Sequence, residues 1–160
     1  DVGIPVMGHI GLTPQSIHQL GGFRVQGRSS DAARTLLDDA LALEQAGCFA
    51  IVLEAVPARV ATLISEWLNV PTIGIGAGSG CDGQVLVSND LLGLFDRFTP
   101  RFIKQYSNLH AEMLHAFERY RKEVQRREFP GSEHTFGIPD DEWQTFVDGL
   151  DDVRPGGELS

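Results

Sequence analysis

The chain has 160 residues, of which 42% are hydrophobic and 22% charged, the proportions of a globular domain with a real core. Its formal net charge of −9 leaves no basic excess to neutralise phosphates, which argues against a nucleic-acid partner. No apolar stretch approaches the roughly 20 residues that a membrane-spanning helix needs, and two cysteines give no disulfide framework, so a reducing compartment is expected.

Short apolar runs alternate with helical patterns in the first half of the chain. Asp31 begins a helix with Ser29 or Ser30 as its N-cap, and Gly47 ends it. A second helix is expected over 56–68, where apolar residues recur at a spacing of three to four. Strands are expected at 4–10, 49–54, 72–75 and 85–87. This order predicts an α/β fold with parallel strands.

The connection between the third and fourth strands does not fit a simple repeat. Only a few residues separate Gly76 from Gln84, which is too little chain for a crossover helix. Either these two strands are not parallel neighbours, or a compact loop joins them.

The last third of the chain predicts one long helix and an acidic tail. Apolar residues alternate at a helical spacing over 102–128. Beyond Phe136 the chain becomes acidic, although 143–150 has the pattern of one short amphipathic helix, and the final residues, 153–160, are expected to be disordered. The expected domains are therefore 1–136 and a flexible acidic tail, 137–160.

Two polar residues stand at the carboxyl ends of buried strands. Glu54 follows an unbroken apolar run, and burying an ionised carboxylate there costs several kcal/mol unless it is paired. His9 ends the first run in the same way. Ligands bind at this edge of parallel sheets and barrels. The alternatives are structural: Glu54 caps a backbone amide or pairs with Arg59, and His9 is a satisfied core histidine.

The run Ile73–Gly80, IGIGAGSG, has a glycine at every second position. Amide-rich loops of this kind hold anions in some proteins. The run lacks the lysine of a phosphate-binding loop and the spacing of a dinucleotide fingerprint. We favour the alternative, a turn that lets the backbone approach its neighbours closely.

Several segments together resemble the ketopantoate hydroxymethyltransferase family. The resemblance runs in order over about residues 3–136. It is carried by GHIGLTPQS (8–16), GGFRVQGR (21–28), DALALEQAG (39–47), VLEAVP (52–57), PTIGIGAG (71–78), DGQVLV (82–87) and PGSEHTF (130–136).

This resemblance implies a (β/α)₈ barrel of the phosphoenolpyruvate mutase and isocitrate lyase type. It implies the transfer of a hydroxymethyl group from 5,10-methylenetetrahydrofolate to 3-methyl-2-oxobutanoate, giving 2-dehydropantoate for pantothenate synthesis. The glutamate of the family's LE-x-VP motif, its catalytic base, matches Glu54. The histidine of its GH-x-GLTPQ motif, which lines the keto-acid site, matches His9.

The resemblance also implies that much of the site lies outside this chain. The family's Mg²⁺ ligands and substrate lysine precede the matched motifs, so no metal ligand is assigned here. We expect the carboxyl-terminal half of the barrel, inactive without the amino-terminal half, in a homo-oligomer that is cytoplasmic, or mitochondrial if the source is eukaryotic. Two other interpretations stay open: a C–C lyase on a related barrel, and a non-catalytic half-barrel that serves assembly.

Overall fold

The computed structural model describes residues 3–13, 25–96 and 99–150, so the expected disorder of 153–160 lies outside the described residues. The chain divides into two units, residues 1–110 and residues 111–160. The domain boundary expected after residue 136 stays a prediction. Within the described ranges, no helix is long and apolar enough to cross a membrane.

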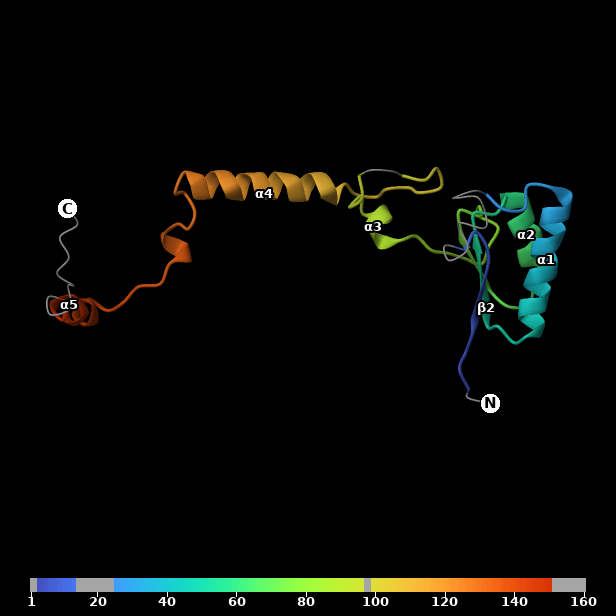
Figure 1. Ribbon diagram of the computed structural model, residues 1–160, viewed down its shortest axis with the longest axis horizontal. Coiled ribbons are helices and arrows are strands. Elements are labelled where there is room, and N and C mark those ends of the chain that lie inside the picture. The colour runs from blue at the N-terminus through green and yellow to red at the C-terminus, as the bar shows by residue number, and fades with distance from the viewer. Residues whose placement is uncertain (1–2, 14–24, 97–98, 151–160) are drawn as a thin grey trace, which may run out of the picture. The chain divides into compact units, whose positions relative to one another are not determined.

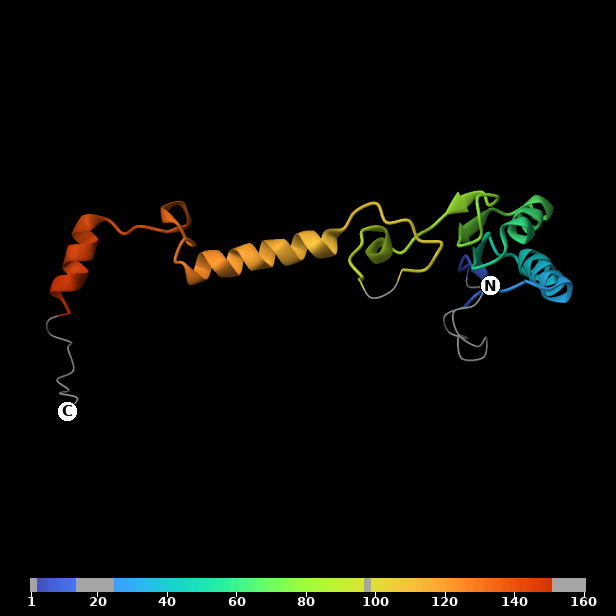
Figure 2. The same ribbon diagram turned by 90° about the horizontal axis from the view of Figure 1, so that it is seen from above.

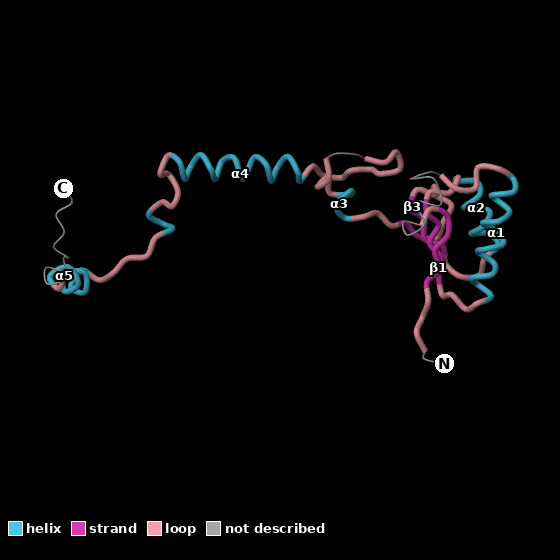
Figure 3. Tube along the Cα trace, viewed as in Figure 1, coloured by secondary structure: helices cyan, strands magenta, loops and turns pink. Residues whose placement is uncertain are grey.

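Four parallel strands lie side by side in chain order in the first unit. Figures 1 and 3 show this sheet beside helices α1 and α2. They are β1 (Met7–Gly11), β2 (Ala50–Glu54), β3 (Thr72–Ile75) and the two-residue β4 (Gly83–Gln84). Helices α1 (Ser30–Gln45) and α2 (Ala58–Trp67) connect the first three strands, and both lie on the same face of the sheet (Figure 2). The α/β fold with parallel strands is confirmed.

The core lies between this sheet face and the two helices. Successive strand residues point to opposite faces, and the register places Ile10 beside Leu53, so that both face the helices. Ile51 and Leu53 are fully buried. They pack in one cluster with residues of both helices, among them Leu36, Leu37, Ala40, Ala61 and Ile64. Burying each large aliphatic side chain contributes about 1.5–3 kcal/mol.

The opposite face of the sheet is apolar but uncovered. The alternation places Val52 and Glu54 of β2 there, together with His9 of β1 and Ile73 and Ile75 of β3. Val52, Ile73 and Ile75 are only half-buried, and no helix in the described part of the chain packs against them (Figure 2). An apolar face of this kind normally packs against another layer.

Local signals account for helix α1. The Ser29 hydroxyl accepts a hydrogen bond from the Ala32 N–H at 3.2 Å, which satisfies one of the free amides of the first turn. The chain leaves the helix through Gly47, whose φ of 90° suits glycine. Glu44, near the end of α1, also fixes the connection between α2 and β3. Its Oε1 accepts hydrogen bonds from the Asn69 and Val70 N–H groups at 2.6 and 3.1 Å.

A compact loop joins β3 to β4, which resolves the alternative that the sequence leaves open. The two strands are parallel neighbours, with Ile73 beside Gly83. Gly76 and Gly78 both have positive φ. The side-chain amide of Gln84 donates to the Gly78 carbonyl at 2.9 Å, which closes the loop.

Three expected elements differ from the prediction. The first strand, expected at 4–10, is Met7–Gly11. The fourth strand, expected at 85–87, is Gly83–Gln84 instead, and Val87 is the N-cap of helix α3 (Ser88–Leu91). The long helix α4 spans Leu109–Gln125, whereas a helix was expected from residue 102. Residues 102–108 are held by contacts elsewhere: the Phe102 ring lies against Gly76, and the Tyr106 N–H donates to the Leu91 carbonyl at 2.8 Å.

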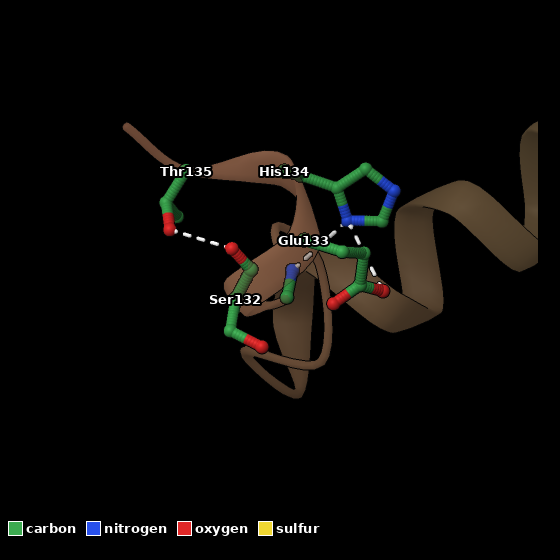
Figure 4. Close-up of polar contacts among 5 residues, drawn as sticks. Ser132, Glu133, His134 and Thr135 are labelled. Atoms are coloured by element: carbon green, nitrogen blue, oxygen red, sulfur yellow. Dashed lines mark hydrogen bonds and ion pairs between the residues drawn. The ribbon is translucent and has the colours of Figure 1, made fainter. Parts of the chain in front are cut away.

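The second unit contains most of α4 and helix α5 (Asp140–Asp148), with a short 3₁₀ helix, Ser132–His134, between them. The Phe129 ring packs against those of Tyr120 and His134, with centroids 5.6 and 5.1 Å apart. His134 Nδ1 accepts from the Gly131 N–H at 3.2 Å, and the Thr135 hydroxyl donates to the Ser132 carbonyl at 2.8 Å (Figure 4). These contacts fold the PGSEHTF motif on itself, and Phe129 links it to Tyr120 of α4.

A hydrogen-bonded pair, buried Thr72 and exposed Asp82, anchors the start of β3. Thr72 is fully buried. Its backbone N–H and its hydroxyl both donate to Asp82 Oδ2, at 2.8 and 2.9 Å. Hydrogen bonds from Thr72, the backbone N–H first, stabilise the carboxylate and so lower the pKa of Asp82 below its ordinary value of 3.8.

We therefore predict that Asp82→Asn reduces the acid sensitivity of the fold. Because the folded pKa lies below the unfolded one, the contribution of Asp82 is fully present above the ordinary pKa of 3.8 and is lost as pH falls through the folded value. Urea unfolding from neutral to acidic pH should show a smaller loss of unfolding free energy for Asp82→Asn than for the unaltered chain. Asp38→Asn, on the exposed face of α1, serves as the control. Equal pH slopes in the unaltered chain and Asp82→Asn would contradict this role.

Candidate active site

Strands β1 and β2 place His9 and Glu54 at one edge of the sheet. Glu54 is the last residue of β2, and it lies beside Gly11, the last residue of β1. His9 comes two residues before Gly11, so it projects from the same face as Glu54, the face that α1 and α2 leave uncovered.

The two side chains contact each other directly. His9 Nε2 lies 3.0 Å from Glu54 Oε2. An ionised carboxylate can only accept a hydrogen bond, so Nε2 is the donor to the carboxylate form of Glu54. The side chain of Glu54 is 16% exposed and that of His9 is 35% exposed. The pair is therefore reachable from the uncovered face, although the carboxylate is largely shielded.

The described residues do not show the three structural alternatives for Glu54 and His9. Glu54 pairs with His9 rather than with Arg59, and no described backbone amide is capped by its side chain. His9 is partly exposed and is not a core histidine. Among the described residues, Glu54 Oε1 has no hydrogen-bond partner, which leaves this oxygen available for a ligand.

The backbone on both sides of Glu54 is fixed by neighbouring strands. Its carbonyl accepts the Leu12 N–H at 2.8 Å, and the next residue, Ala55, donates to the Ile75 carbonyl at 2.9 Å. Ala55 is buried and has a φ of 51°, a left-handed conformation that costs on the order of 1–3 kcal/mol outside glycine. The surrounding hydrogen bonds hold this strained turn, and with it the direction of the Glu54 side chain.

Gly11 permits this arrangement, and sequence reasoning did not identify it. Its φ is 90°, and a Cβ at this position would collide with the Glu54 carbonyl oxygen. The GH-x-G spacing in the first strand is the signal that could have indicated a close approach of two strands.

The glycine-rich run after β3 behaves as a closely packed turn. A Cβ on Gly78 would meet Ala58 at 2.5 Å, and one on Gly80 would collide with Thr62. Both neighbours belong to α2. The favoured interpretation, a turn that lets the backbone approach its neighbours, agrees with this packing.

The described residues do not form a metal site. No group of three or more His, Cys, Asp and Glu side chains in this part of the chain has the arrangement that a metal needs. Beside Glu54 there is one imidazole and no second carboxylate, whereas Mg²⁺ prefers several oxygen ligands in octahedral geometry. What the arrangement does offer is an oriented carboxylate that can accept a proton.

The sequence model of ketopantoate hydroxymethyltransferase matches residues 1–132. The chain belongs to this family. Three curated relatives carry the name 3-methyl-2-oxobutanoate hydroxymethyltransferase. The protein of Oleidesulfovibrio alaskensis is 60% identical over 153 residues, 94% of this chain and 53% of that protein. Those of Nitratidesulfovibrio vulgaris and Syntrophobacter fumaroxidans are 56% and 53% identical, over 94% and 96% of this chain and 49% and 54% of those proteins.

This chain thus spans about half the length of the curated relatives that it matches. The family is named for hydroxymethyl transfer. Within the family match, the structure brings together His9 and Glu54, which lie 45 positions apart in the sequence.

We predict that Gly11→Ala destabilises the first unit more than Gly47→Ala does. Both glycines have a φ of 90°, but a Cβ on Gly47 would meet nothing within 4 Å, whereas one on Gly11 would collide with the Glu54 carbonyl. Urea unfolding should show a loss of about 1 kcal/mol for Gly47→Ala and of about 2 kcal/mol or more for Gly11→Ala. Equal losses of unfolding free energy in the two variants would contradict the tight packing of Gly11 against the Glu54 carbonyl.

Proposed function

We propose that this chain supplies the catalytic base for hydroxymethyl transfer from 5,10-methylenetetrahydrofolate to 3-methyl-2-oxobutanoate, giving 2-dehydropantoate. Membership of the family supports the reaction class. The observation that carries the proposal is the His9–Glu54 pair, a shielded but reachable carboxylate at the carboxyl edge of a parallel sheet.

The proposed setting of this pair is the carboxyl-terminal half of a (β/α)₈ barrel. The order of the strands supports it, because each parallel strand is added to the same side of the previous one. In doubly wound sheets the strand order reverses and helices cover both faces, whereas barrels carry their helices on the outer face alone. The uncovered face of His9, Val52 and Glu54 would then face the barrel interior, which the amino-terminal half completes.

In this setting Glu54 would act as the general base. Its Oε1 takes the proton from C3 of the keto acid, and the electron pair of that C–H bond moves into the enolate. Water hydrolyses the methylene group of the folate to formaldehyde, which releases tetrahydrofolate. The enolate carbon then bonds to the formaldehyde carbon, and the resulting alkoxide takes up the proton that Glu54 holds. His9 holds Oε2 through the 3.0 Å hydrogen bond, which keeps Oε1 directed at the substrate.

The Mg²⁺ that the family resemblance implies stays a prediction for residues outside this chain. Since the described residues lack a site for it, we assign it no step. We propose that the amino-terminal half supplies the metal ligands and most of the keto-acid site, in a cytoplasmic enzyme.

We also propose that the complete protein forms a homo-oligomer. Helix α4 supports this, because it exposes a row of large apolar side chains: Met113, Phe117, Tyr120 and Val124. Such rows are usually covered by a partner surface.

We predict that Glu54→Gln lowers the formation of 2-dehydropantoate by a factor of about 10²–10⁴, because the amide cannot accept the C3 proton. The assay uses this chain assembled with a matching amino-terminal half, both substrates and Mg²⁺. Glu66→Gln, an exposed glutamate of α2, is the matched control and should leave turnover unchanged. Wild-type turnover in Glu54→Gln would refute the assigned base.

A second prediction concerns His9. Replacing His9 by Ala removes one hydrogen bond to a charged group, worth about 1.5–3 kcal/mol, and leaves Glu54 in place. Turnover should fall by roughly tenfold to a hundredfold, less than in Glu54→Gln, while the unfolding midpoint changes little because His9 lies outside the core. A loss as large as that of Glu54→Gln would contradict a role for His9 that is limited to holding Glu54.

A further inference from the structure

One segment between α3 and α4, residues 99–108, forms a strap beside the carboxyl edge of the sheet. Figures 1 and 2 show it, in yellow, on the side of the sheet opposite α1 and α2. The His9–Glu54 pair projects from this uncovered side. The strap and the pair therefore lie on the same side of the sheet.

The strap touches the end of β3 through one aromatic ring. A Cβ on Gly76 would lie 2.9 Å from ring atoms of Phe102, so the ring packs directly on this glycine. Gly76 follows Ile75, the last residue of β3, and Ile75 is the register partner of Glu54. The Ile75 carbonyl also accepts the Ala55 N–H at 2.9 Å. Because neighbouring strands lie about 4.8 Å apart, the ring covers the strand end next to the one that carries the carboxylate.

Backbone hydrogen bonds give the strap a fixed end and a turn. The Tyr106 N–H donates to the carbonyl of Leu91, the last residue of α3, at 2.8 Å. The Ile103 N–H donates to the Pro100 carbonyl at 3.0 Å, which places Phe102 in a turn. Most residues of the strap are exposed. The strap is thus anchored to α3 at one end, and the Phe102 ring attaches its turn to the sheet.

The Phe102 ring keeps an open apolar surface at this edge. It is 40% exposed although it packs on Gly76. The Glu54 side chain on the adjacent strand is 16% exposed. An apolar surface beside a reacting carboxylate limits the access of water to it.

The proposed reaction requires such protection. Glu54 takes the proton from C3 and holds it until the alkoxide takes it up. Water that reaches Oε1 between these two transfers exchanges this proton and returns the enolate to the keto acid. Sites that generate reactive intermediates avoid these losses by excluding water.

We propose that the strap covers the carboxyl edge during the reaction and that Phe102 shields the proton on Glu54 from water. The inference rests on the proposed function, because it concerns the base of that reaction. Phe102 is a positioning residue: it takes no part in the bond changes, and it acts by closing the edge beside Glu54.

The test is the partition of the enolate in D₂O, in the enzyme assembled from this chain and the amino-terminal half. NMR measures the deuterium that enters C3 of 3-methyl-2-oxobutanoate for each 2-dehydropantoate formed. Phe102→Ala should raise this ratio about tenfold or more, because water then reaches Glu54 before the enolate reacts. General damage to the site would lower deuterium entry and product formation together, and would leave the ratio unchanged.

Two further variants serve as controls. Phe102→Leu keeps an apolar side chain on Gly76 and should retain most of the shielding. Tyr106→Ala removes another aromatic ring of the strap, 66% exposed, and should leave the ratio unchanged. In this chain alone, the ring should shift the Gly76 α-proton signals upfield, and Phe102→Ala should abolish that shift. Gly76 signals that are the same in both proteins would overturn the contact and with it the inference.

The two proposals fail in different ways. An assembled enzyme that forms 2-dehydropantoate with the same ratio in Phe102→Ala as in the unaltered protein refutes the shielding alone. An assembled protein that shows neither deuterium entry nor product refutes the proposed function. Faster exchange of the His9 Nε2 proton with water in Phe102→Ala, followed by NMR in that protein, would still support the strap as a cover of the His9–Glu54 pair, and an unchanged exchange rate would refute it.

Discussion

The parallel pairing of β1 with β2 is the constraint on which the candidate site depends. Its register sets Gly11 beside Glu54 and brings His9 within hydrogen-bond distance of the carboxylate. If the pairing register of β2 shifted by one residue, Glu54 would point toward the helices, where burial of an ionised carboxylate would be costly. The absence of a side chain at Gly11 lets the two strand ends approach this closely, because a Cβ there would collide with the Glu54 carbonyl.

The two faces of the sheet have different roles. The helix-facing side chains, such as Ile51 and Leu53, are fully buried and stabilise the unit. The other face carries the His9–Glu54 pair among half-buried apolar residues and has no layer over it in the described chain. This asymmetry agrees with a chain that spans about half the length of its curated relatives. The helix-facing side stabilises the unit, and the other side leaves the His9–Glu54 pair accessible.

Local signals predicted the elements that local interactions determine. The strand at Thr72–Ile75 and the cap of α1 at Ser29 follow from apolar runs and capping chemistry, and both were found. The helix expected from residue 102 begins at Leu109, because Phe102 packs on Gly76. That contact joins residues far apart in the sequence, so no local pattern reveals it.

The same distinction holds at the site. Glu54 and His9 stood out individually as polar residues at strand ends, but their pairing depends on the register of β1 against β2. Sequence reasoning considered Arg59 as the partner of Glu54, whereas the structure pairs Glu54 with His9.

The central claim is that Glu54 removes the C3 proton of the keto acid. Exchange of that proton in D₂O, followed by NMR in the absence of any folate, isolates this step in the enzyme assembled from this chain and the amino-terminal half. The account predicts steady exchange that Glu54→Gln abolishes while 3-methyl-2-oxobutanoate still binds. Exchange at the unaltered rate in Glu54→Gln would contradict it.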